Sequence, residues 1–220
     1  MEQTELKPGA YYVTTELADG STLEGLSLLS PSGAFAVAFS DQDLTFGTLT
    51  FSSPDVISGT GTDYVLNESW ELTSGSISGT VTSSETAELR ATASGFYSDS
   101  TLQRENTYSD LGITLSDISG TYTMDEPGYL TSSVTIASDG TVTGSDQTGC
   151  VFNGQITIPD QSINVFEVDY SSSNCGSLSY ASASDRNGDF SGIGSYDPSL
   201  QELEVVSRNG KIASIFFGTR

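Results

Sequence analysis

The chain has 220 residues, of which 29 are acidic and only seven basic, giving a net charge of −22. This balance argues against nucleic acid and against an anionic membrane surface as partners, because both require a basic face. The absence of histidine removes the commonest general base and the commonest zinc ligand. No apolar run approaches the ~20 residues that a membrane-spanning helix needs. We therefore expect a protein that is not an enzyme and holds no cofactor.

Short strands joined by tight turns are predicted along the first half. Apolar residues alternate with Ser and Thr, and turn-forming Gly, Pro and Asp residues separate the segments. The predicted strands cover residues 10–17, 22–29, 33–40, 44–51, 56–66, 74–83, 87–94 and 101–108. Residues 109–118 carry a weak helical pattern, from which we expect one turn at most.

A second series of strands is predicted at residues 120–124, 130–137, 140–145, 150–158, 163–170, 176–183, 189–196, 200–207 and 211–217. Asp139-Gly140, Asn187-Gly188 and Asn209-Gly210 separate three of the pairs. Such dipeptides favour hairpins, because both central residues of a type I′ turn need positive φ.

The two series look like copies of one another. Seven matches keep the same order: Gly9-Ala10-Tyr11 with Gly120-Thr121-Tyr122, Gly33 with Gly140, Gly47 with Gly154, Pro54-Asp55 with Pro159-Asp160, Asp63-Tyr64 with Asp169-Tyr170, Gly75–Gly79 with Gly188–Gly192, and Glu88-Leu89 with Glu202-Leu203. A duplicated all-β chain follows, with domains at residues 1–112 and 113–220. Each half must hide its sheet edges, and a small antiparallel meander barrel of about eight strands does so fully. Two β-sandwiches, or one shared 16-strand sandwich, are the alternatives.

Two cysteines, Cys150 and Cys175, stand 25 positions apart in the second half. No CxxC motif accompanies them, so a disulfide is favoured over a metal site, and buried free thiols are the alternative. A disulfide favours the periplasm, the cell surface or secretion. Residues 1–7 lack the apolar core of a signal peptide, so export would imply a signal removed earlier.

One weak calcium candidate lies in the second half, where Asp185, Asn187 and Asp189 place side-chain oxygens at alternate positions. This spacing opens a calcium loop, but Phe190 and Tyr196 replace the Gly and Glu that an EF-hand requires. An ordinary hairpin explains the same residues equally well.

Exposed tyrosines are the candidate binding residues. Five are flanked by polar residues or lie near predicted loops, where they could stack on sugars or meet a protein: Tyr12, Tyr97, Tyr129, Tyr180 and Tyr196. Paired carboxylates for glycoside hydrolysis could come from Glu167 with Asp169 or from Glu202 with Glu204. With this many acidic residues, such pairs also arise by chance.

The second half resembles a loosely defined group of uncharacterised secreted or lipoprotein-type β-barrel proteins of proteobacteria, over residues 119–217. The shared residues are Asp139-Gly140-Thr141, Gly144-Ser145-Asp146, Gly149-Cys150, Asn153-Gly154, residues 164–168, Asn174-Cys175 and Phe190-Ser191-Gly192. The resemblance implies a periplasmic, outer-membrane-anchored or secreted location, with a lipid anchor in some members. It implies no activity.

Three functions remain open from the sequence. The first is a non-catalytic exported bacterial protein that binds a partner protein, a glycan or a small ligand. The second is a lipocalin-like carrier with an apolar ligand inside one barrel. The third is a carbohydrate-active enzyme that uses paired carboxylates.

Overall fold

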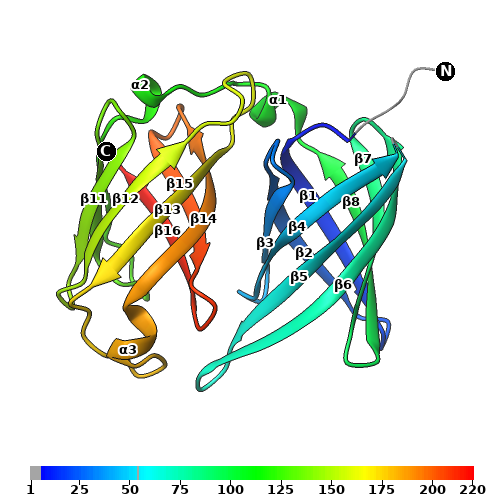
Figure 1. The fold of residues 1–220 in the computed structure, drawn as a ribbon, viewed down its shortest axis with the longest axis horizontal. Coiled ribbons are helices and arrows are strands. Elements are labelled where there is room, and N and C mark those ends of the chain that lie inside the picture. The colour runs from blue at the N-terminus through cyan, green and yellow to red at the C-terminus, as the bar shows by residue number, and fades with distance from the viewer. Residues whose placement is uncertain (1–5, 54) are drawn as a thin grey trace. The chain divides into compact units, whose positions relative to one another are not determined.

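The computed structural model describes residues 6–53 and 55–220, and these form two antiparallel barrels (Figure 1). The main division into compact units falls between Asp110 and Leu111. In each barrel the strands follow one another in chain order, and the last strand pairs with the first. The all-β fold of two tandem small barrels is confirmed, as closed barrels rather than sandwiches. Residues 1–5, in the N-terminal lead, and Pro54, in one repeat match, lie outside the described residues.

The first barrel contains eight strands: β1 (Gly9–Leu17), β2 (Thr22–Leu29), β3 (Ala34–Phe39), β4 (Leu44–Ser53), β5 (Val56–Leu66), β6 (Trp70–Ser83), β7 (Thr86–Ala93) and β8 (Phe96–Arg104). The second contains β9 (Gly120–Met124), β10 (Ser132–Ile136), β11 (Thr141–Asp146), β12 (Val151–Thr157), β13 (Phe166–Ser173), β14 (Gly188–Asp197), β15 (Glu202–Arg208) and β16 (Ala213–Thr219).

Three helical turns of four residues each complete the described structure: α1 (Asn106–Ser109), α2 (Leu115–Ile118) and α3 (Ala183–Arg186). Within residues 6–53 and 55–220, no helix has the length and apolar character to cross a bilayer.

Large side chains opposite glycines fill the barrel interiors. Phe35 is the cross-strand partner of Gly47, and Phe166 is the partner of Gly194. A Cβ atom added at Gly47 would lie 2.6 Å from Cε1 of the Phe35 ring. The missing side chain therefore makes room for a ring inside a barrel that is narrow by its strand number. Each interior holds a packed apolar cluster.

In the first barrel, a tyrosine and an arginine lie side by side where the last strand pairs with the first, a feature called here the tyrosine–arginine closure. Tyr11 on β1 lies opposite Arg104 on β8. The Tyr11 hydroxyl donates to the Lys7 carbonyl, and Arg104 Nε donates to the Pro8 carbonyl at 2.9 Å. The side chain of Arg104 is fully buried and also bonds Asp110 at 2.7 Å.

The second barrel repeats this closure. The Tyr122 hydroxyl on β9 donates to the Ile118 carbonyl at 3.0 Å, and Arg220 Nη1 donates to the Ser119 carbonyl at 2.9 Å. The Arg220 guanidinium lies 5.6 Å from the centre of the Tyr122 ring. The acceptors stand four and three residues before the tyrosine, as they do in the first barrel. Equivalent contacts at equivalent positions strengthen the case for duplication.

The match of Gly33 with Gly140 also agrees with the structure. Gly33 and Gly140 both adopt positive φ, of 88° and 84°. The Gly33 carbonyl accepts from Leu49 N at 2.8 Å, and the Gly140 carbonyl accepts from Ile156 N at 2.9 Å.

Some later matches do not hold in register. Gly47 pairs with Gly61, whereas Gly154 pairs with Tyr170. Gly61 therefore takes the place of Tyr170, and matching Asp63-Tyr64 with Asp169-Tyr170 is wrong. The hairpin from Gly154 to Tyr170 is two residues longer than that from Gly47 to Gly61, so matching residue types misaligns the two barrels here.

Two further expectations are corrected between β13 and β14. Residues 176–183 do not form a strand; they make a loop that leads into α3, with a single bridge between Leu178 and Ala181. Ser182 caps α3 in a capping box with Asp185, and this local bonding favours a helical turn. Asn187-Gly188 is not a hairpin turn, because Asn187 ends α3 and Gly188 begins β14.

Candidate functional site

An open cavity of about 310 Å³ lies on the second barrel, over strands β12, β13 and β14. It is lined by Asn153, Gly154, Gln155, Asp169, Tyr170, Ser171, Asp189 and Phe190. The polar lining residues alternate along their strands with inward-facing ones, so their side chains stand on the outer face of the sheet.

Cross-strand register brings the polar residues together. Asn153 is the partner of Ser171, which in turn is the partner of Asp189. Gln155 is the partner of Asp169 in the neighbouring row. Two amides, two carboxylates and a hydroxyl therefore gather on three adjacent strands, all exposed to solvent.

Aromatic rings support this surface. The rings of Tyr170 and Phe190 are stacked with centroids 5.0 Å apart, and Phe152 meets Tyr170 edge-on at 5.9 Å. The Tyr170 hydroxyl lies 2.8 Å from Ser207 Oγ. Burial raises the pKa of Tyr170 to about 12, so this phenol stays neutral at ordinary pH. The strands beneath the cavity are thereby packed tightly.

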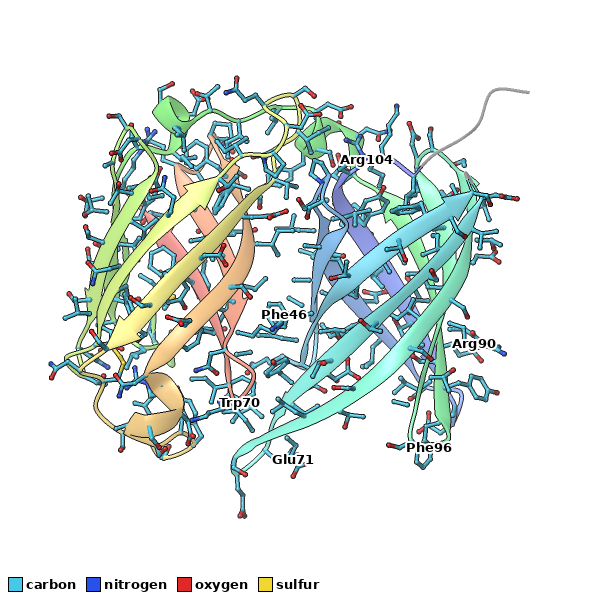
Figure 2. All side chains as sticks on the ribbon, viewed as in Figure 1. Phe46, Trp70, Glu71, Arg90, Phe96 and Arg104 are labelled. Atoms are coloured by element: carbon cyan, nitrogen blue, oxygen red, sulfur yellow. A yellow bond between two sulfur atoms is a disulfide. The ribbon has the colours of Figure 1, made fainter. Side chains whose placement is uncertain are left out.

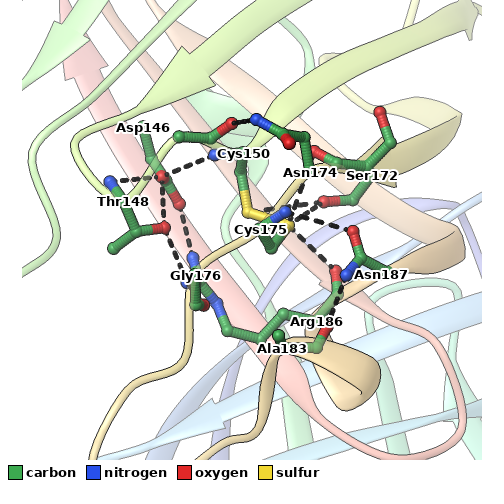
Figure 3. Close-up of a disulfide and its surroundings, with 12 residues drawn as sticks. Asp146, Thr148, Cys150, Ser172, Asn174, Cys175, Gly176, Ala183, Arg186 and Asn187 are labelled. Atoms are coloured by element: carbon green, nitrogen blue, oxygen red, sulfur yellow. Dashed lines mark hydrogen bonds and ion pairs between the residues drawn. A yellow bond between two sulfur atoms is a disulfide. The ribbon is translucent and has the colours of Figure 1, made fainter.

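A disulfide fixes the end of the same strands (Figure 3). Cys150 stands directly before β12, and Cys175 follows β13 by two residues. Ser172 Oγ lies 2.9 Å from the sulfur of Cys175. The predicted Cys150–Cys175 disulfide is confirmed, although Cys175 opens a loop rather than the expected strand.

A buried ion pair reinforces the disulfide. Arg186 Nη2 lies 2.5 Å from Asp146 Oδ2, and both side chains are more than nine-tenths buried. The other Asp146 oxygen accepts from the backbone N–H groups of Thr148 and Cys150. Arg186 also donates to Thr148 Oγ1 at 2.7 Å, which ties the segment between β13 and β14 to the β11–β12 turn.

The calcium candidates have other roles. Asp185 accepts from the Ser182 hydroxyl and lies 3.6 Å from Lys211 Nζ. The Asn187 side chain accepts from Cys175 N and donates to the Ala183 carbonyl. Asp189 belongs to the cavity. In the described part of the chain, no three His, Cys, Asp or Glu side chains group as a metal site would require. The calcium site stays a prediction.

Four of the five candidate tyrosines are exposed, but they lie on separate elements and none lines the cavity. Tyr12 stands on β1 and Tyr97 on β8, where the guanidinium of Arg90 lies 4.7 Å from the Tyr97 ring centre. Figure 2 shows Arg90 and Phe96 at the end of the barrel where β7 turns into β8. Tyr129 packs edge-on against Phe217, and Tyr180 lies in the loop before α3.

Tyr196 is not a surface residue. It is only 5% exposed, and its hydroxyl accepts from Arg220 Nη2 at 2.8 Å. The sequence misleads here because the polar residues Asp197 and Ser195 flank Tyr196, whereas residues 193–196 of β14 are all buried.

The carboxylate pairs occupy outward positions of their strands. Glu167 and Asp169 alternate with the buried Phe166 and Val168. Burial, and after it the charge of Glu202, raises the pKa of Glu204. This pair shows like-charge coupling, but a cleft between its members is not seen, and hydrolysis stays a prediction.

Compared with protein-family models, curated proteins and solved structures, the chain finds no match. The candidate site therefore rests on its own geometry.

Proposed function

We propose that the protein is a non-catalytic, exported bacterial binding protein whose second barrel takes a ligand at the cavity over β12–β14. The observation that carries this proposal is the convergence of five exposed polar side chains on strands that a disulfide and a buried ion pair hold rigid. Sites on rigid strands lose little conformational entropy when they bind.

Export is supported by the disulfide, because such bonds persist in oxidising compartments. The high negative charge suits a solvated protein outside the cytoplasm. A periplasmic, surface-anchored or secreted location, with or without a lipid anchor, fits the resemblance noted from the sequence.

The carrier alternative has less support, since the apolar interior of each barrel is occupied by its own packed side chains. The proposed site instead offers polar groups on an outer face.

Thermal-shift measurements test the binding function with four ligand classes: saccharides, short peptides, amines and fatty acids. A ligand that binds only the folded state raises the melting temperature by mass action. We expect a hydrophilic class to raise the transition of the second barrel, and Gln155→Ala to reduce that rise. A rise with fatty acids alone would instead support a carrier of apolar ligands. No rise with any class would contradict binding at this site.

A further inference from the structure

We infer that the cavity over β12–β14 recognises a neutral, hydroxyl-rich sugar residue of a glycan. This inference rests on the proposed binding function and specifies its ligand.

The lining residues select against anions. Asp169 and Asp189 carry carboxylates, and none of the residues that line the cavity is a lysine or an arginine. Phosphate, sulfate or uronic acid groups would meet like charge here, at a cost that grows when water is displaced.

The cavity is rich in acceptors. Gln155 Nε2 donates to the carbonyls of Asp139 at 2.8 Å and Ile156 at 3.3 Å, so both amide hydrogens are engaged. The Gln155 oxygen and the carboxylates of Asp169 and Asp189 can then only accept from a ligand. The matching ligand must donate several hydrogen bonds.

Hydroxyl groups fit the remaining residues better than ammonium groups do. Asn153 carries an amide NH₂, so the same site also offers a donor group, while the Ser171 hydroxyl donates to the Asn153 carbonyl at 3.4 Å and can accept from a ligand. A hydroxyl donates and accepts, whereas an ammonium only donates. A sugar that presents several hydroxyls to adjacent strands can therefore satisfy both kinds of group.

The neighbouring strand extends the surface without charge. Thr141 and Thr143 on β11 are exposed and are the cross-strand partners of Gln155 and Asn153. Strands lie about 4.8 Å apart, so β11 adds room beside the cavity for a second sugar unit. The hydroxyls of this border both donate and accept hydrogen bonds, as the hydroxyls of a second sugar unit do.

A glycan microarray with neutral, amino-containing, sulfated and uronic-acid glycans tests the inference on the whole protein. We expect binding to neutral glycans, little change between low and moderate salt, and no binding to sulfated or uronic-acid glycans. Binding confined to anionic glycans would overturn the inference.

The duplication provides matched variants for titration calorimetry with a bound glycan. Gln155→Ala with Asp169→Ala removes two cavity side chains, while Thr48→Ala with Thr60→Ala changes the equivalent exposed pair on β4 and β5. We expect the first double variant to weaken affinity at least tenfold and the second to leave it unchanged. Equal affinities would contradict the inference. If the first double variant is poorly folded, the affinity of Asn153→Ala alone provides a second test.

Two outcomes separate this inference from the function on which it rests. If only amines or peptides bind, and Asp169→Ala abolishes their binding, the cavity is a binding site but the sugar assignment is wrong. If no ligand class perturbs residues of β12–β14, both proposals fail.

Discussion

Arg186 and Asp146 show how burial determines the contribution of an ion pair to stability. Each is more than nine-tenths buried, and the pair joins the loop after β13 to the β11–β12 turn. Arg90 and Asp99 form an ion pair of similar length in the first barrel, but their side chains are 55% and 47% exposed. The two pairs therefore form a natural comparison.

Arg186→Met leaves Asp146 charged and buried without its partner. We expect the free energy of unfolding of the second barrel to fall by about 3–5 kcal/mol in urea denaturation. Arg90→Met, the matched change at the exposed pair, should leave the free energy of unfolding of the first barrel nearly unchanged. Similar small losses for both variants would show that the buried pair does not hold the loop.

Asp43 gives the first barrel a dependence on pH. Burial, then the charge of Asp41, then that of Asp63 raise the pKa of Asp43 to about 6. Burial also raises the pKa of Asp63, against the hydrogen bond that Thr45 donates. The folded state thus binds these protons more tightly than the unfolded chain, whose Asp pKa is about 3.9.

Stability of the first barrel should therefore increase as pH falls from 8 to 5, because ionised Asp43 opposes folding above its folded pKa. Asp43→Asn should raise the melting temperature at pH 8 and flatten the profile. In the control Asp19→Asn, hydrogen bonds from Ser21 lower the pKa of the native carboxyl, so that variant should lose stability at pH 8. A lower melting temperature for Asp43→Asn at pH 8 would refute this account.

At the scale of elements, strands β12–β14 are held at one end by covalent and ionic contacts. The disulfide links residues 25 positions apart, across the β12–β13 hairpin. The first barrel has no cysteine, so its equivalent strands have no covalent cross-link.

Replacing Cys150 and Cys175 together by alanine should lower the stability of the second barrel by roughly 3–4 kcal/mol in the chain-entropy model. Differential scanning calorimetry should show the transition of the second barrel moving to lower temperature and that of the first unmoved. An unchanged second transition would mean that the Asp146–Arg186 ion pair stabilises these strands without the disulfide.

The repeated tyrosine–arginine closure predicts that each barrel depends on its own arginine. Hydrogen bonds from a charged group contribute about 1.5–3 kcal/mol. Arg104→Met should lower hydrogen-exchange protection of amides in β1 and β8 about tenfold or more, and Arg220→Met should do so in β9 and β16. Each variant serves as the control for the other. Loss of protection in both barrels from one variant would contradict separate closures.

Strand positions could be predicted well where apolar and polar residues alternated between clear turn signals, as in β1 and β11. The prediction failed between β13 and β14, because Ser182 and Asp185 favour a helical cap that alternation does not reveal. Register could not be predicted from matching residue types alone, as Asp63-Tyr64 shows. Small insertions shift a strand without changing its composition.

The candidate site was harder to predict than the fold. Asn153, Gln155 and Asp169 look like ordinary outward residues in sequence, and only cross-strand pairing brings them together with Asp189. The chemistry of tyrosine suits binding, yet the candidate tyrosines that are exposed lie apart. A binding surface built across three strands leaves no local motif.

At the scale of the whole molecule, the two barrels differ mainly in one region. The second copy carries the disulfide, the buried ion pair, the longer loop with α3 and the polar cavity. The closure of each barrel and the pairing of glycines with rings are common to both. Features shared by the two barrels serve the fold, and we propose that those at β12–β14 serve binding.

The most direct test of glycan binding over β12–β14 is backbone amide chemical-shift mapping of the whole protein during titration with a neutral oligosaccharide. The account predicts shifts at residues 153–155, 169–171 and 189–191, with none at the equivalent residues 46–48 and 60–62 of the first barrel. Shifts confined to the first barrel or to the interior of either barrel, or no shifts at saturating oligosaccharide, would contradict it.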